Sequence, residues 1–150
     1  MLRWYTPGYM ADALEARLNT RAPKRVKDDL SALAMRRHID ESELTRSLID
    51  EAIRRETYPG VAFRTTSTGR DAAVEGRRLY IWQVMETLWA SDGDITAAAE
   101  YLDLRPDQVR TAMAYYTAYP DEIDRVIKQN QEEAARLESL QALQEKTRRR

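Results

Sequence analysis

Four polar side chains, the first of them Glu15, alternate with Ala, Leu, Thr and Ala in residues 15–22, which read Glu-Ala-Arg-Leu-Asn-Thr-Arg-Ala. A period of two is typical of a β-strand, and it places Arg17, Asn19 and Arg21 on one face. Arginine can donate two hydrogen bonds to guanine, and asparagine can pair with adenine through two hydrogen bonds. Two such strands paired as a ribbon fit the major groove of DNA. The segment therefore predicts a base-reading face, with an ordinary solvated strand face as the alternative.

Two helical patterns follow and would position this strand. The first starts at Pro23, which suits the first turn of a helix, and carries apolar residues at helical spacing, namely Val26, Leu30, Leu33 and Ala34. A turn at 36–38 leads to a second helix, which Asp40 can cap with Glu43 three residues later. One unpaired strand on a unit of about 45 residues buries too little surface to be stable. We therefore expect a homodimer in which two copies of the strand pair antiparallel.

From Arg17 to Ile53 the chain resembles the ribbon-helix-helix family of repressors, the MetJ/Arc/CopG type. The resemblance rests on the strand at 17–22, the helix after it, the small turn and the sequence Asp-Glu-Ser-Glu-Leu at 40–44. It implies that Arg17, Asn19 and Arg21 read the bases of a palindromic operator in double-stranded DNA.

The same resemblance implies a phosphate contact at the start of the second helix. In the family the backbone N–H groups there face a DNA phosphate, and the corresponding residues here are Glu41 and Ser42. The sequence departs from the family at two positions. His38 stands where the family usually has glycine, and Asp40 stands where it usually has serine or threonine.

A turn-rich stretch follows, because four of the five glycines fall between Gly60 and Gly93. We expect short strands at 61–63 and 72–74 joined as a hairpin, and then a helix with apolar residues from 80 to 88. Asp94 can cap the next helix, and Pro106 suits the first turn of another after a turn at 103–105. Two short helices joined by a tight turn form a helix-turn-helix shape.

The exposed start of the second of these short helices would offer Gln108 and Arg110 as a second surface for DNA or a partner. The alternative is that the three helices only pack a core or a dimer surface. Residues 58–120 hold six basic and eight acidic side chains, a net charge of −2, and this charge favours the alternative.

Residues 58–127 also resemble a small bacterial domain family regarded as an antitoxin-type helix-turn-helix. The resemblance rests on Tyr-Pro-Gly-Val-Ala-Phe-Arg at 58–64, Gly-Asp at 93–94, and the tyrosine-rich stretch at 112–123. Members commonly stand beside PIN-like ribonuclease toxins, so the resemblance implies such a toxin as a partner.

One long helix is predicted from Asp121 to about Lys146, with an apolar stripe too narrow for a buried core helix. Ile127, Leu137 and Leu140 on this stripe are the residues we expect to bind a toxin. Pairing with a copy of itself and a solvated tail are the alternatives.

The composition excludes several kinds of site. The 150 residues contain no cysteine and one histidine, which excludes thiolate metal sites, disulfides and multi-histidine sites. There is no glycine-rich phosphate loop and no nucleophile beside a base, so we expect no enzyme, no cofactor and no metal. The net charge of −1 excludes a polybasic protein that coats nucleic acid. No apolar run approaches a membrane span, and we expect a cytoplasmic protein.

The sequence thus predicts a mainly α protein in three parts: a ribbon-helix-helix unit at 12–56, a hairpin and helix-turn-helix-like antitoxin domain at 58–127, and a helical tail at 128–150. The expected function is that of a DNA-binding antitoxin, which represses its own operon and neutralises a PIN-like ribonuclease. The alternatives are a repressor without a toxin and a dimeric scaffold for protein interactions.

Overall fold

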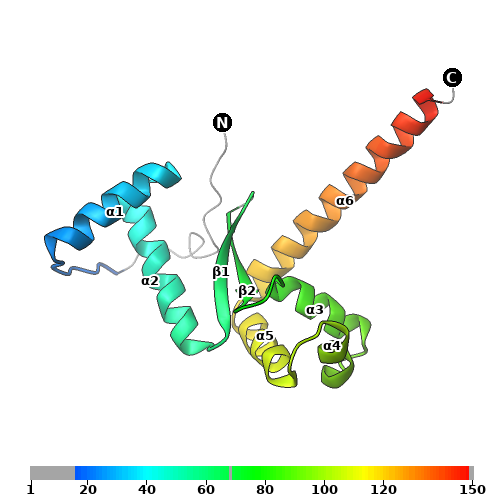
Figure 1. Ribbon diagram of the computed structural model, residues 1–150, viewed down its shortest axis with the longest axis horizontal. Helices are drawn as coiled ribbons and strands as arrows, with labels where there is room; N and C mark the ends of the chain where they lie inside the picture. The colour runs from blue at the N-terminus through cyan, green and yellow to red at the C-terminus, as the bar shows by residue number, and fades with distance from the viewer. Residues whose placement is uncertain (1–15, 68, 149–150) are drawn as a thin grey trace.

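The computed structural model describes residues 16–67 and 69–148, and helices dominate it (Figure 1). Six helices and one two-stranded antiparallel sheet are formed within these ranges. Their bounds are α1 Lys24–Arg37, α2 Glu41–Thr57, β1 Val61–Thr66, β2 Gly69–Val74, α3 Ile81–Ala90, α4 Ile95–Tyr101, α5 Pro106–Ala118 and α6 Pro120–Arg148. The mainly helical class, the hairpin and the long last helix are confirmed.

The turn between α1 and α2 is built from local hydrogen bonds. His38 adopts the left-handed conformation (φ 53°), where glycine is the commonest residue. The His38 N–H donates to the Met35 carbonyl and the Ile39 N–H to the Ala34 carbonyl, each at 3.2 Å, which satisfies the last carbonyls of α1. Asp40 then caps α2, as predicted, because its carboxylate accepts from two backbone N–H groups of the first turn.

Residues 16–23 form neither strand nor helix in the single chain, and their side chains are exposed. A strand requires a neighbour to receive its backbone hydrogen bonds, and no second chain is present. The predicted strand is therefore not formed here, and the paired ribbon stays a prediction. Glu15 and the part of the expected first domain at 12–15 lie outside the described residues.

The hairpin is longer than predicted. β1 and β2 pair from Val61↔Val74 at one end to Thr66↔Gly69 at the other, so the ladder includes the polar pairs Arg64↔Asp71 and Thr65↔Arg70. The polar residues at 64–70 predict a loop, whereas backbone pairing keeps 64–66 and 69–70 in the strands, and Arg70 also forms an ion pair with Glu51 of α2. The start of β1 and the second half of β2 contribute Val61, Ala72 and Val74 to the core.

The core lies between the hairpin and the last four helices. Gly93 (φ +80°) follows α3, Asp94 caps α4, and Pro106 occupies the first turn of α5. These three positions agree with the predicted boundaries. The buried apolar cluster consists of Val61, Ala72, Val74, Ile81, Val84, Met85, Leu88, Ala98, Ala99, Leu104, Val109, Ala112, Tyr115, Ile123 and Ile127.

The first turns of α6 belong to this core, which corrects one prediction. Ile123, Val126 and Ile127 are buried, because α6 packs against α3 and α5 before it leaves the body of the molecule. The narrow apolar stripe is exposed only within residues 131–148, where every residue is exposed. Ile127 is consequently not available for the toxin contact expected of it.

The cap of α4 gives a direct test of this local account. The Asp94 carboxylate accepts from the N–H groups of Thr96 at 2.9 Å and Ala97 at 3.1 Å. We expect Asp94→Ala to lower the free energy of unfolding by about 0.5–2 kcal/mol, measured by urea denaturation. Glu100→Ala on the exposed face of the same helix is the control, with a change within about 0.5 kcal/mol. Equal stability of the two variants would contradict the capping role.

Candidate functional site

The predicted base-reading residues lie together on an exposed segment. Arg17, Asn19 and Arg21 are all exposed, and so are the alternating residues between them. Leu18, which the alternation assigns to the opposite face, keeps 78% of its surface accessible.

The start of α2 is less suited to a phosphate than predicted. The Ser42 N–H already donates to Asp40 Oδ2 at 2.8 Å, and these backbone contacts hold the pKa of the Asp40 carboxyl below its usual range. Hydrogen bonds from Lys27 and Ser31 to Glu41 likewise lower the pKa of the Glu41 carboxyl. Two carboxylates therefore occupy this helix end, and a phosphate would meet their negative charge. The geometry gives no support to the expected contact at Glu41 and Ser42.

The second predicted surface is partly used by the fold itself. Gln108 Oε1 accepts from the Arg105 N–H at 3.0 Å, so this side chain closes the start of α5. Arg105 pairs with Asp107 through two contacts of 3.0 Å each. Arg110 is exposed on the same helix. α4 and α5 are two short consecutive helices joined by a turn, and Gln108 serves as a cap at the start of α5.

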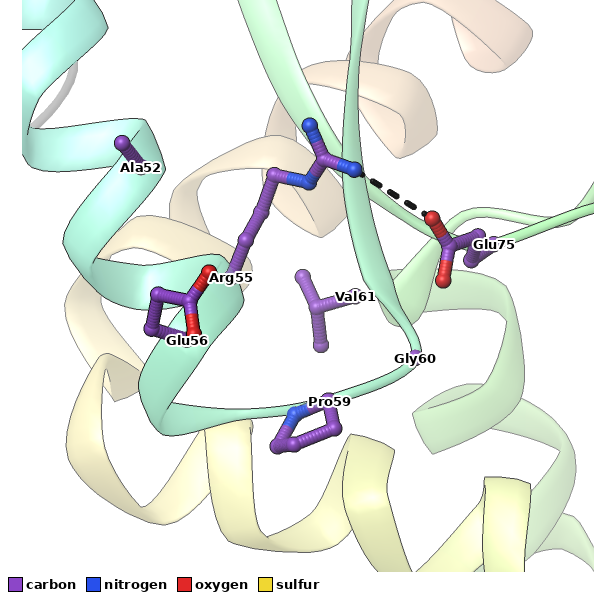
Figure 2. Close-up of a pocket in the computed structure, with 7 residues that line it drawn as sticks. All are labelled: Ala52, Arg55, Glu56, Pro59, Gly60, Val61 and Glu75. Atoms are coloured by element: carbon purple, nitrogen blue, oxygen red, sulfur yellow. Dashed lines mark hydrogen bonds and ion pairs between the residues drawn. The ribbon is translucent and has the colours of Figure 1, made fainter.

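Two neighbouring polar hollows lie near the end of α2, and sequence reasoning did not find them. One, of about 380 Å³, lies between the end of α2 and the hairpin, and the Arg55–Glu75 ion pair of 3.3 Å crosses it (Figure 2). The other, of about 190 Å³, shares Pro59, Gly60 and Glu75 with the first and reaches Arg105 and Asp107. Their arginines each have a carboxylate partner, so the charges of the hollows indicate no particular ligand.

A buried polar cluster joins α2 to α5 and α6. The Arg54 side chain is only 5% exposed, and its guanidinium reaches Glu122 at 2.6 Å, Asp50 at 2.9 Å and the Tyr115 hydroxyl at 2.9 Å. The same group lies 3.9 Å from the centre of the Tyr119 ring, within range of a cation–π contact. The Tyr115 hydroxyl in turn donates to Glu122 at 2.9 Å. The positive charge of Arg54 is thus surrounded by partners from α2, α5 and α6.

The electrostatics of this cluster keep Arg54 and Tyr115 protonated. Burial alone would lower the pKa of the Arg54 guanidinium, but Tyr115 and Glu122 outweigh burial and raise it. Burial raises the pKa of the Tyr115 hydroxyl, and the neighbouring Glu122 carboxylate adds to the rise. Tyr115 therefore stays protonated and keeps its donor for Glu122. These groups are fixed in structural contacts, which is unlike a proton-transfer site.

A second ion pair ties α2 to the hairpin. Arg70 on β2 makes two contacts with Glu51 on α2, Nε–Oε1 at 2.8 Å and Nη2–Oε2 at 2.6 Å. Ser47 donates to the same carboxylate at 3.4 Å. Together with Arg54, this pair connects the segment predicted as the first domain to the segment predicted as the second.

Removing the charge of Arg54 tests how much the buried polar cluster contributes to the free energy of unfolding. Arg54→Ala leaves Glu122 buried without its cation, and we expect the free energy of unfolding to fall by about 3–5 kcal/mol in urea denaturation. The control is Arg55→Ala, the next residue, whose ion pair with Glu75 is exposed and contributes about 0–1 kcal/mol. Similar losses for the two variants would contradict the account.

Asp71 gives a prediction about pH. Burial raises the pKa of its carboxyl, and the charge of Glu122 adds to the rise, while a hydrogen bond with Thr66 opposes it. A pKa raised by folding means that this carboxyl favours the folded state most at acid pH, and that this contribution is lost as pH rises through the folded pKa.

We therefore expect Asp71→Asn to be more stable than the parent protein at pH 7, with the advantage shrinking at acid pH. Urea denaturation at a series of pH values measures the difference. Glu100→Gln, an exposed substitution, is the control and should show no such trend. An Asp71→Asn difference that is constant with pH would contradict the prediction.

Within residues 16–67 and 69–148, no helix combines the length and the apolar composition needed to cross a membrane. The same ranges contain no group of three or more His, Asp or Glu side chains arranged to hold a metal ion. Comparison with protein-family models, with curated proteins and with solved structures gives no match to this chain. What the protein does must therefore be argued from the geometry of the described residues.

Proposed function

We propose that the chain is a dimeric, DNA-binding repressor whose segments at 17–22 pair as a ribbon in the major groove. One observation carries the proposal: an exposed alternating segment leads into α1, a left-handed turn at His38 and the capped helix α2. This order of elements is the one expected of a ribbon reader.

The uncovered apolar side chains of this unit support a dimer. Leu18 is 78% and Val26 is 42% exposed, although both lie on faces that the sequence pattern assigns to the interior. A second copy would remove them from water and would also supply the neighbour that the extended segment lacks. A symmetric dimer achieves both with the same surface on each chain.

The charge distribution supports recognition of specific sequences. A net charge of −1 gives weak non-specific attraction to DNA, because that attraction depends on neutralising many phosphates. Two-fold pairing presents Arg17, Asn19 and Arg21 twice, opposite two half-sites. Affinity then depends on hydrogen bonds to bases, for which arginine and asparagine are suited.

The antitoxin role stays a prediction of the family resemblance. Of the residues expected to contact a toxin, Leu137 and Leu140 are exposed and Ile127 is buried, and no feature of the described ranges identifies a ribonuclease. Purification of the intact protein from its native host tests this role, since a bound PIN-like ribonuclease would establish it. Purification without one would leave a repressor.

Replacing both strand arginines tests DNA binding. We expect Arg17→Ala with Arg21→Ala to abolish sequence-specific binding to the DNA upstream of the gene, measured by fluorescence anisotropy, because each lost guanine contact costs about 1–3 kcal/mol. The control is Arg78→Ala with Lys128→Ala, which removes the same charge from exposed positions outside the ribbon segment. It should change affinity far less.

The dimer must be measured in the same samples. Light scattering should give unchanged masses for the parent and the arginine variant, so that a loss of binding reflects lost contacts. If the parent protein dimerises but binds no DNA even at low salt, the repressor is excluded and a scaffold remains. If the arginine variant binds as tightly as the parent, the ribbon does not read DNA.

A further inference from the structure

The second half of α6 is not covered by any other element among residues 16–67 and 69–148. Gln131 Nε2 donates to Glu86 of α3 at 3.3 Å, and from Gln131 to Arg148 every side chain is exposed. Figure 1 shows this half of the helix projecting away from the body of the molecule. A free helix of this length is marginal in water unless an apolar face is packed.

Three leucines give this half of α6 an apolar face. Leu137, Leu140 and Leu143 are 54%, 48% and 62% exposed. They are spaced three residues apart, so they form a slanted row along one side of the helix. An open groove of about 620 Å³ runs beside the first two of them, bordered by Glu132, Glu133 and Arg136. Side chains of a second helix would fit such a row and groove.

The charges on either side of the leucines identify the second helix. Two acidic residues and one basic residue precede the row, namely Glu132, Glu133 and Arg136, and one acidic and two basic residues follow it, namely Glu145, Lys146 and Arg148. Glu132 and Arg148 are each eight residues from Leu140, or roughly 12 Å along the axis. The helix therefore carries an acidic group and a basic group at matching distances from its central leucine.

We propose that this half of α6 pairs with the same segment of a second copy, antiparallel and centred on Leu140. In that arrangement Leu140 meets Leu140 of the partner, Leu137 lies level with Leu143, and the net acidic end of each segment lies beside the net basic end of the other. A parallel pair in register would instead place acidic groups beside acidic groups and basic beside basic. The Glu132 carboxylate lies 3.9 Å from the Lys128 ammonium, and this ion pair between two exposed groups is too weak to prevent the exchange.

This contact does not depend on DNA binding. The ribbon segment at 17–22 and the row on α6 are separate surfaces, so each can fail without the other. If both pairings form about different two-fold axes, α6 joins ribbon dimers into a larger assembly.

Introduced cysteines test the pairing and its direction, since the native sequence contains none. Under mild oxidation Leu140→Cys should form a cross-linked dimer by itself. Leu137→Cys and Leu143→Cys should each cross-link poorly alone but efficiently when the two proteins are mixed first. Efficient cross-linking of every single variant would indicate a parallel pair, and absence of cross-linking in all of them would overturn the proposal.

Charge reversal supplies a second test, measured as the association constant by analytical ultracentrifugation. Glu132→Lys with Glu133→Lys should weaken association about tenfold, as should Lys146→Glu with Arg148→Glu, from several exposed pairs acting together. The fourfold variant should restore it, because both partners exchange sign.

The matched control is Arg17→Ala with Arg21→Ala, which should leave the α6 contact intact while DNA binding is lost. Charge-reversed variants that associate like the parent would overturn the proposal. So would a bound ribonuclease on the leucine row of a protein that does not pair through α6 when alone.

Discussion

The burial of one guanidinium determines how the described parts of the molecule fit together. Arg54 can leave water only if carboxylate, hydroxyl and aromatic partners surround it, because an isolated buried charge is prohibitively costly. Those partners come from the same helix at Asp50, from α5 at Tyr115, from Tyr119 just after α5, and from the first turn of α6 at Glu122. The end of α2, α5 and α6 must therefore approach together. Glu51 and Arg70 add the hairpin to the same arrangement.

This constraint gives α2 two distinct ends. Its start, at Asp40 and Glu41, is exposed or half-buried and belongs with α1 and the ribbon segment. Its last turns are fixed by ion pairs to the rest of the molecule. The boundary predicted near residue 57 therefore separates two sequence motifs. It does not separate two independent bodies, because the ion pairs of Glu51 and Arg54 connect the two sides. A ribbon that binds DNA would transmit its orientation to α6 through side chains that have little freedom to move.

Local features of the fold were predictable from the sequence, and distant pairings were not. The caps at Asp40 and Asp94, the turn at His38 and the start of α5 at Pro106 depend on neighbouring residues, so spacing along the chain was sufficient. Arg54 and Glu122 are 68 residues apart, and nothing in their local patterns links them. The burial of Ile127 was missed for the same reason, since the stripe on α6 looks uniform and only its packing against other elements separates the buried from the exposed part. Of the proposed DNA-binding residues, the sequence supplied Arg17, Asn19 and Arg21, and their exposure agrees with that role without testing it.

If the pairings proposed at residues 17–22 and on α6 both form, they have a geometric consequence. Each contact would then be two-fold, so the size of the assembly depends on the angle between the two axes. Coincident axes close a dimer, whereas different axes generate a tetramer or an open chain. That angle is set within one chain by how α2 is held against α6, and the contacts that hold it are those of Arg54 with Glu122 and Tyr115. A substitution that loosens this buried cluster would therefore broaden the range of assemblies, although it lies in neither pairing surface.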